Sequence, residues 1–327
     1  MQKIKEFDGI RGVAILAIVT CHICYGIDSM SPLGQYLGGT FNIVFFALSS
    51  ILIGINIKTA QYSINDKLCK SSFFKKRLNR LVPDLWIFLT IYLLIAFFFN
   101  INCTVPQIIA NYLMLGWFAK IPYCGHLWFV TMILFCYIFF TISLNIKNKL
   151  LLLINLSITC IIGQVIFNII HFPAYMFLIL YVSGIFMLYS SDILYLMNEF
   201  KTWIVFIVTS SINVIYYFLI SSNFLVIGNL DYYYMAVMSG ISMIILLYKL
   251  FQLTKVSKFL TWVSIFSYQI YLVHHPLCNT NWINKIVGSQ FLAVITIFLM
   301  SFFCAYVLTR FRNFIISKVF RLNNEKR

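Results

Sequence analysis

Charged residues are scarce in this sequence of 327 residues: only 10% of them are Asp, Glu, Lys or Arg, and just nine are acidic. A soluble globular domain carries about a quarter charged residues, so this composition excludes an ordinary soluble enzyme. Apolar residues take their place, because 61% of the chain is hydrophobic and its mean hydropathy is +0.91. The sequence therefore predicts an integral membrane protein.

A long polar stretch that would form a second domain is also missing, and the chain has no internal repeat and no heptad pattern. At about 20 residues per helical span, the apolar stretches predict an all-α, polytopic fold of about ten transmembrane helices in a single domain over residues 1–327. The expected spans lie near 10–27, 37–57, 84–99, 127–146, 150–168, 174–190, 202–221, 232–249, 259–278 and 289–309.

The basic residues are distributed unevenly between the two sides of the membrane. With the N-terminus inside, all of the 24 Lys and Arg residues except Lys120 and Lys285 fall on the cytoplasmic side. The positive-inside rule then places both termini in the cytoplasm. It also predicts a cytoplasmic basic loop at 58–83, a cytoplasmic tail at 310–327, and an outer loop at 100–126 with an interfacial or re-entrant segment. Since topology explains the positive charge, we expect no nucleic-acid partner.

The nine Cys residues are scattered, so the sequence has no disulfide framework. Cys21 and Cys24 bracket His22 in "CHIC", but no second ligand cluster accompanies them, and we expect packing and no metal site. The apolar start of the chain lacks a clear small-x-small cleavage site. We therefore expect an uncleaved first span in place of a signal peptide.

Two ionisable residues stand out in the first span. Arg11 lies at the mouth of the apolar run and His22 lies well inside it. Eleven residues of α-helix make three turns plus about 20°, so the two side chains share one face, about 16 Å apart along the axis. An ionisable residue inside a membrane usually marks a functional site. A positive-inside anchor is the alternative for Arg11, and a hydrogen-bonded core histidine is the alternative for His22.

The motif that contains these residues, "FDGIRGVAILAIVTCH" (7–22), resembles the opening span of the membrane-bound acyltransferase 3 family. Four further segments are similar to family motifs and follow in the same order. They are "FNIVFFALSSILIG" (41–54), "FFKKRLNRLVP" (73–83), "GHLWFVTMILFCYI" (125–138) and "FSYQIYLVHHP" (266–276). The chain departs from the family pattern at Ser50, where Gly is usual, and it lacks a Ser-x-x-Glu-Glu motif in the fourth span. The resemblance is to the short, polysaccharide-modifying branch, without an appended periplasmic domain.

The resemblance implies transfer of an acyl group, most often acetyl from cytoplasmic acetyl-CoA, to a sugar hydroxyl of a cell-surface polysaccharide or its lipid-linked precursor. It also implies location in the bacterial cytoplasmic membrane, among its lipids. Acetyl-CoA carries phosphates and is cytoplasmic, so we expect Arg11, Arg77 and Arg80 to hold it, because Arg binds phosphate in a bidentate manner. The alternative for Arg77 and Arg80 is a patch that attracts anionic lipids.

His22 and Arg11 are the predicted catalytic residues, with His22 as the general base. A neutral imidazole can take the proton of a sugar hydroxyl as that hydroxyl attacks the thioester. A covalent acyl-His22 intermediate is the alternative mechanism. His126, Trp128 and His274 are the predicted acceptor-binding residues at the outer side. The competing interpretations are a solvated loop position for the two histidines and an interfacial aromatic belt for Trp128.

A second function class is a transporter or flippase of a lipid-linked sugar, in which Arg11 and His22 line a translocation path. Such proteins usually contain two pseudo-repeated halves, and this sequence lacks them. A non-catalytic assembly subunit leaves the Arg11–His22 spacing unexplained. The sequence therefore favours an acyl-CoA-dependent O-acetyltransferase.

Overall fold

The computed structural model describes residues 4–59, 67–143, 149–169, 175–227, 230–279 and 288–324. Within these ranges the chain is helical and contains no β-strand, which confirms the all-α prediction. The helices are α1 (Lys5–Tyr25), η1 (Asp28–Met30), α2 (Ser31–Thr59), α3 (Lys67–Phe98), α4 (Val105–Tyr112), η2 (Gly125–Leu127), α5 (Trp128–Ser143), α6 (Lys149–Ile169), α7 (Tyr175–Leu188), α8 (Ser190–Glu199), α9 (Thr202–Ser221), α10 (Leu230–Thr254), α11 (Lys258–Ile265), α12 (Ser267–Asn279) and α14 (Gln290–Asn324).

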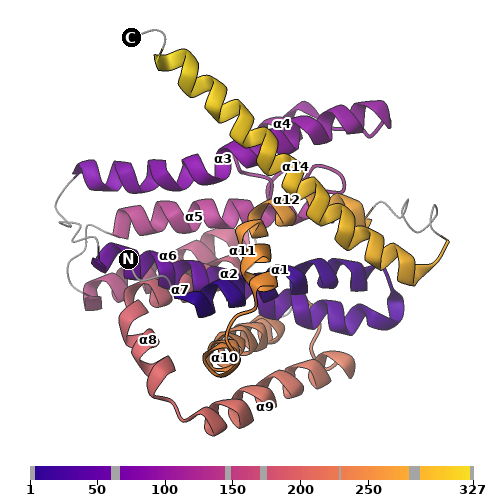
Figure 1. The fold of residues 1–327 in the computed structure, drawn as a ribbon. Coiled ribbons are helices and arrows are strands. Elements are labelled where there is room, and N and C mark those ends of the chain that lie inside the picture. Colours follow the sequence, from indigo (N-terminus) through magenta and orange to yellow (C-terminus); the bar gives the residue numbers. More distant parts are fainter. Residues whose placement is uncertain are drawn as a thin grey trace. The chain divides into compact units, whose positions relative to one another are not determined.

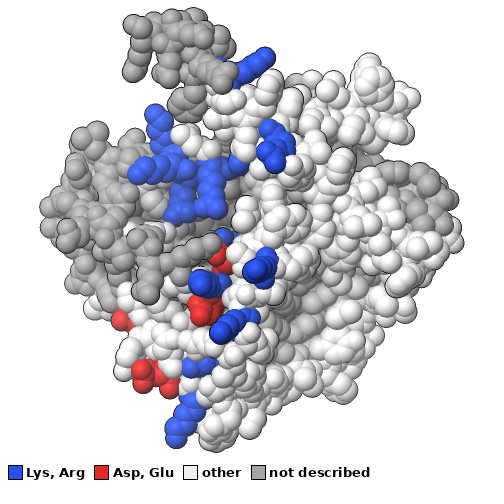
Figure 2. Space-filling model, in the orientation of Figure 1, with Lys and Arg blue, Asp and Glu red and all other residues white. Residues whose placement is uncertain are grey.

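Six of the described helices are long and apolar enough to cross a membrane. The six spans are Lys5–Tyr25, Ser31–Asn56, Phe73–Phe98, Thr202–Ser221, Asp231–Thr254 and Gln290–Lys318. Helices α7 and α8 form a seventh candidate, bent by 78° where the two meet (Figure 1). Uncharged side chains cover a broad part of the face drawn in Figure 2, as a lipid-exposed surface requires. The chain is thus a multi-pass membrane protein, while the total of ten spans stays a prediction.

Helix α3 differs from the sequence expectation. The sequence predicts a third span near 84–99 after a loop at 58–83, whereas α3 begins at Lys67 and continues through Pro83 to Phe98. A loop up to residue 83 is wrong because the residues from Lys67 on, rich in Lys, Leu and Arg, form a helix readily. A proline inside a helix costs about 3 kcal/mol, and burial of the neighbouring Leu81 and Leu85 offsets part of this cost.

The chain divides into two compact units. Unit 1 comprises Met1–Phe74 and Phe135–Ser264, and unit 2 comprises Lys75–Leu134 and Ile265–Arg327. In unit 1, α2 packs against α1, α7, α9 and α10, so it is the central helix of that unit. In unit 2, α12 packs along α14, and η2 contacts α12.

Small residues allow the close helix packing around α2. A Cβ atom added at Gly54 would lie 2.1 Å from the backbone oxygen of Met187 on α7. A Cβ atom added to Gly240 of α10 would lie 2.5 Å from the Cβ of Ile43. Membrane helices approach each other closely at such positions. Ser50, which replaces a usual Gly, is 2% exposed, and its hydroxyl donates to the carbonyl one turn earlier in α2.

A buried polar network joins α2, α9 and α10 in unit 1. The amide oxygen of Asn213 accepts hydrogen bonds from Tyr36 (2.9 Å) and Ser239 (2.7 Å), and its nitrogen donates to Ser242 (2.8 Å). Ser239 also bonds to Thr40 at 2.7 Å. Hydrogen bonds of this kind hold helices together where no water is present to compete for them.

The segment that follows α3 and contains α4 folds back against α3 within unit 2. Helix α4 has eight residues, and a capping box of Thr104 and Gln107 starts it. At its other end, the Tyr112 carbonyl accepts a hydrogen bond from Trp86 Nε1 at 2.9 Å, and Tyr112 Oη bonds to Thr90 at 2.8 Å. These contacts place the end of α4 beside the middle of α3. Insertion of this segment into the membrane stays a prediction.

Candidate functional site

Helix α1 carries the two residues that the sequence singled out. It is continuous from Lys5 to Tyr25, so Arg11 and His22 do lie on one unbroken helix of unit 1. Helical geometry then separates them by about 16 Å along one face. The structure thus supports the spacing on which the sequence argument depends.

Close packing with α2 determines which side of α1 faces the bundle near His22. A Cβ atom added at Gly38 would lie 2.9 Å from Cys21 Sγ, and one added at Gly34 would lie 3.1 Å from the Cys21 carbonyl oxygen. Cys21 and Cys24 are buried, at 2% and 3% exposure. These two cysteines are therefore the small packing residues that the sequence predicts.

His22 itself is only half-buried, next to the tightly packed cysteines. Successive residues of a helix point about 100° apart, so the imidazole points away from the contact between Cys21 and Gly38. Its ring centroid lies 6.2 Å from that of Tyr25. A half-buried imidazole remains accessible to a substrate.

The Arg11 end of α1 is also fixed by packing. A Cβ atom added at Gly12 would lie 2.5 Å from the Leu260 carbonyl oxygen, so the backbone of α11 lies directly against α1 here. Arg11 Nη1 pairs with Asp8 Oδ1 at 3.8 Å, and the Arg11 side chain is 25% exposed. Arg11 is thus held on a rigid helix with part of its guanidinium accessible to an anion.

Unit 2 contains a cluster of three histidines. His126 from η2 stacks on His275 from α12, with ring centroids 4.6 Å apart, and lies 5.5 Å from His274. The three residues are 2%, 7% and 0% exposed, respectively. The structure therefore brings together two residues that the sequence treats separately. It also adds His275, the residue next to His274, and it excludes solvated loop positions for all three.

Backbone carbonyls fix the orientation of these rings. The Nε2–H of His126 donates to the Leu272 carbonyl at 3.1 Å. The Nδ1–H of His274 donates to the Tyr271 carbonyl at 2.7 Å, and the hydroxyl of Tyr271 donates in turn to the carbonyl of His126. A ring nitrogen that donates to a carbonyl must carry the proton, so these bonds also set the tautomers. The sequence analysis missed Tyr271, because only the fold shows that its hydroxyl bonds to the His126 backbone.

Trp128 begins α5, immediately after the histidine cluster, and its ring is half-buried. Its indole lies edge to face with Trp117, at 6.0 Å between ring centroids. Trp117 is anchored because its backbone N–H donates to the Thr131 hydroxyl at 3.2 Å. Contact between the acceptor and His126, Trp128 or His274 stays a prediction.

Arg77 and Arg80 lie in unit 2, on the helical N-terminal part of α3. Three residues of helix separate them, so their side chains point about 60° apart on neighbouring faces. Arg77 is half-buried and Arg80 is exposed. They do therefore lie on nearly one side of a helix, and their contact with the phosphates of acetyl-CoA stays a prediction.

The sequence analysis missed a buried ion pair in unit 2. Asp84 is fully buried, and its Oδ2 accepts hydrogen bonds from Arg312 Nη1 (3.0 Å) and Gln269 Nε2 (2.8 Å). An Asp within an apolar run was the available signal, since such residues need a partner. No group of three or more potential ligands (His, Cys, Asp, Glu) that could hold a metal ion occurs in the described part of the chain.

Comparison with known proteins identifies the family. The sequence model of the Acyl_transf_3 family, described as an acyltransferase domain, matches residues 4–310, so the chain belongs to this family and the resemblance is confirmed. The chain is also similar to the peptidoglycan O-acetyltransferase OatA of Listeria monocytogenes serovar 1/2a (strain ATCC BAA-679 / EGD-e), with 27% identity over 127 residues. That stretch is 39% of this chain but only 18% of OatA. No solved structure matches the chain.

Proposed function

We propose that this member of the Acyl_transf_3 family is an O-acetyltransferase of the bacterial cytoplasmic membrane. It transfers acetyl from cytoplasmic acetyl-CoA to a sugar hydroxyl of a cell-surface polysaccharide or its lipid-linked precursor. Family membership and the similarity to OatA support a membrane O-acyltransferase that acts on a polysaccharide. The observation that carries the finer proposal is the placement of Arg11 and His22 on one face of the unbroken helix α1.

His22 is the general base in this proposal. Its neutral imidazole accepts the proton of the sugar hydroxyl as the hydroxyl oxygen attacks the thioester carbon. The C–O bond forms, the C–S bond breaks, and the CoA sulfur leaves with the proton that His22 returns. A half-buried ring suits this role, because part of the imidazole stays accessible to the substrate.

Arg11 binds the donor in this proposal. The accessible part of its guanidinium attracts a phosphate of CoA at the cytoplasmic end of α1, and Asp8 holds the side chain in place. The extended pantetheine arm then runs along the helix face and delivers the thioester to His22. Arg77 and Arg80 are further candidate phosphate contacts, and His126, Trp128 and His274 are candidate contacts of the glycan acceptor.

The test is a transfer assay on the purified full chain in proteoliposomes, with labelled acetyl-CoA and a cell-envelope glycan preparation. We expect His22→Ala to lower the transfer rate by roughly 10²-fold or more, the usual contribution of a general base. We expect Arg11→Gln to raise the KM for acetyl-CoA, while Lys5→Gln, an exposed cation at the same end of α1, leaves it nearly unchanged. A His22→Ala rate within tenfold of wild type contradicts the proposal.

A further inference from the structure

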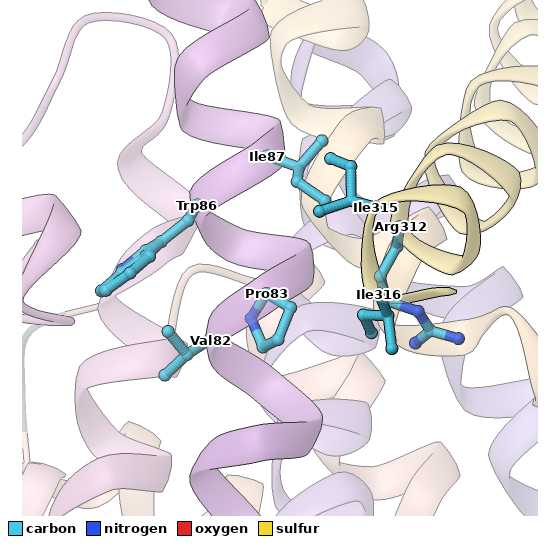
Figure 3. A pocket seen from close by; sticks show the side chains of 7 residues that line it. All are labelled: Val82, Pro83, Trp86, Ile87, Arg312, Ile315 and Ile316. Atoms are coloured by element: carbon cyan, nitrogen blue, oxygen red, sulfur yellow. The ribbon is translucent and has the colours of Figure 1, made fainter. Parts of the chain in front are cut away.

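A groove lies between α3 and α14 in unit 2, with a volume of about 330 Å³. Figure 3 shows its walls, in which the side chains of Ile87, Pro83, Ile315 and Ile316 come from two neighbouring helices. Six of its seven lining residues are apolar. The groove is lined by Val82, Pro83, Trp86, Ile87, Arg312, Ile315 and Ile316.

The lining residues on α3 belong to the candidate span Phe73–Phe98, at a depth where lipid chains are found. Arg312 is 22 residues beyond Gln290, the first residue of α14, which corresponds to about 33 Å of helix. The hydrocarbon core of a bilayer is about 30 Å thick, so Arg312 lies close to its cytoplasmic boundary. Trp86 is 50% exposed, as a tryptophan that contacts lipid would be.

Cations continue the groove toward the cytoplasm. On α3, Lys76 precedes Pro83 by seven residues and Ile87 by eleven, so these side chains share one helix face. Lys75 likewise precedes Val82 by seven residues and Trp86 by eleven, so these three share a neighbouring face. Both lysines are exposed. Each of the two faces of α3 that line the groove therefore carries a lysine on its cytoplasmic side.

Arg312 is positioned at the groove by the buried ion pair. Its Nη1 donates to Asp84, and its Nε and Nη2 donate to Asn313 at 3.2 and 3.0 Å. A guanidinium has five N–H donors, so two remain for a phosphate oxygen. Gln269 donates to the same Asp84 oxygen as Arg312, which helps to hold the carboxylate in place.

We propose that the groove between α3 and α14 binds an anionic phospholipid, with an acyl chain along its apolar walls and the phosphate near Lys75, Lys76 and Arg312. The apolar lining disfavours a free phosphate or a soluble nucleotide as the occupant. The positive charge at one end favours an anionic headgroup over a zwitterionic one. This site is independent of the proposed acetyl transfer, since it requires neither acetyl-CoA nor a glycan.

Fluorescence quenching of Trp86 tests the proposal directly. The full chain is reconstituted in phosphatidylcholine vesicles that contain increasing fractions of phosphatidylglycerol brominated on its acyl chains, or of phosphatidylcholine brominated in the same way. The Trp86 signal is the difference between wild type and Trp86→Phe. Each surface cation contributes about a fivefold preference for anionic lipid, so we expect phosphatidylglycerol to quench Trp86 at a fraction at least fivefold lower.

Two matched pairs of variants separate the headgroup site from the acyl-chain site. Lys75→Gln/Lys76→Gln should remove most of the preference for phosphatidylglycerol, while Lys318→Gln, an exposed cation of α14 outside the groove lining, should preserve it. Ile316→Phe fills the groove and should weaken quenching by both lipids. Leu299 is 65% exposed and lies on α14 outside the groove lining, so Leu299→Phe should leave the quenching by both lipids unchanged.

Equal quenching by the two brominated lipids in wild type would overturn the proposal, because the quenching would then come from the general layer of lipid around the protein. A preference that survives in Lys75→Gln/Lys76→Gln would overturn the assigned headgroup site. The measurement contains no acyl-CoA, so its failure leaves the acetyltransferase proposal untouched. Loss of acetyl transfer in His22→Ala likewise says nothing about lipid binding.

Discussion

The buried pair of Asp84 and Arg312 allows a quantitative prediction. Arg312→Gln removes the cation that lies 3.0 Å from a fully buried carboxylate. The hydrogen bond from Gln269, at 2.8 Å, and a weaker attraction to Arg80 then remain to stabilise that charge. Breaking a buried ion pair by removing one partner typically costs 3–5 kcal/mol, so we expect Arg312→Gln to lower the free energy of unfolding by about 4 kcal/mol.

Substitution of the other partner, Asp84, should lower the free energy of unfolding by less. Asp84→Asn removes the buried charge, keeps the shape of the side chain, and leaves Arg312, which is 24% exposed, in partial contact with solvent. We expect a loss of about 1–2 kcal/mol, the value of a charged hydrogen bond. The double variant Asp84→Asn/Arg312→Gln leaves no uncompensated charge. Its cost should therefore fall below the sum of the single costs by about 2 kcal/mol or more.

The assay is reversible unfolding of the purified chain in mixed micelles with increasing denaturing detergent, for wild type and the three variants. Lys318→Gln serves as the control, since it removes an exposed cation from the same helix. Single costs that add within about 0.5 kcal/mol would refute the reasoning, because they would show that the two side chains do not interact energetically.

Three further predictions concern packing, the polar network and the histidine cluster. Gly54→Ala should destabilise the chain by about 1–3 kcal/mol in the same assay, because the new Cβ would lie 2.1 Å from the Met187 carbonyl oxygen. Asn213→Ala should cost about 3 kcal/mol, because the buried hydroxyls that bond to this amide lose their partner. Tyr271→Phe should raise the KM for the glycan acceptor more than it lowers kcat, because the hydroxyl that holds the His126 backbone is lost; a larger effect on kcat would contradict a positioning role.

Controls exist for the first two of these. Gly125→Ala should be nearly neutral, since an added Cβ there meets its nearest neighbour at 3.9 Å. An equal cost for Gly54→Ala and Gly125→Ala would show that close approach to α7 does not limit the packing. Thr296→Ala, which loses one exposed hydroxyl bond within its own helix, is the comparison for Asn213→Ala. Similar costs for those two would show that the buried network adds no stability.

Much of the fold follows from hydropathy and charge, because apolar length and the positive-inside rule are properties of the sequence itself. The placement of Arg11 and His22 on one helix face could be predicted equally well, since it depends only on the helix period. The start of the third helix was misplaced because a proline is typical of a helix start, whereas the residues around Pro83 extend the helix through it. That outcome depends on tertiary packing, which no local rule contains.

The histidine cluster was only partly predictable for a related reason. His126 and His274 are 148 positions apart, and no periodicity relates residues so distant in sequence. The ring contact at 5.5 Å depends on how η2 meets α12. The Asp84–Arg312 pair joins residues even further apart, and the sequence gives no means to choose one cation among 24.

The most direct test of the acetyltransferase proposal is calorimetric titration of acetyl-CoA into the purified full chain in nanodiscs. It compares wild type, His22→Ala and Arg77→Ala/Arg80→Ala, with acetyl transfer measured on the same samples. We expect wild type to bind and transfer, the double Arg variant to bind more weakly, and His22→Ala to bind while its transfer rate falls by roughly 10²-fold or more. If folded wild-type protein fails to bind acetyl-CoA, or if His22→Ala still transfers acetyl at the wild-type rate, the account of Arg11 and His22 is wrong.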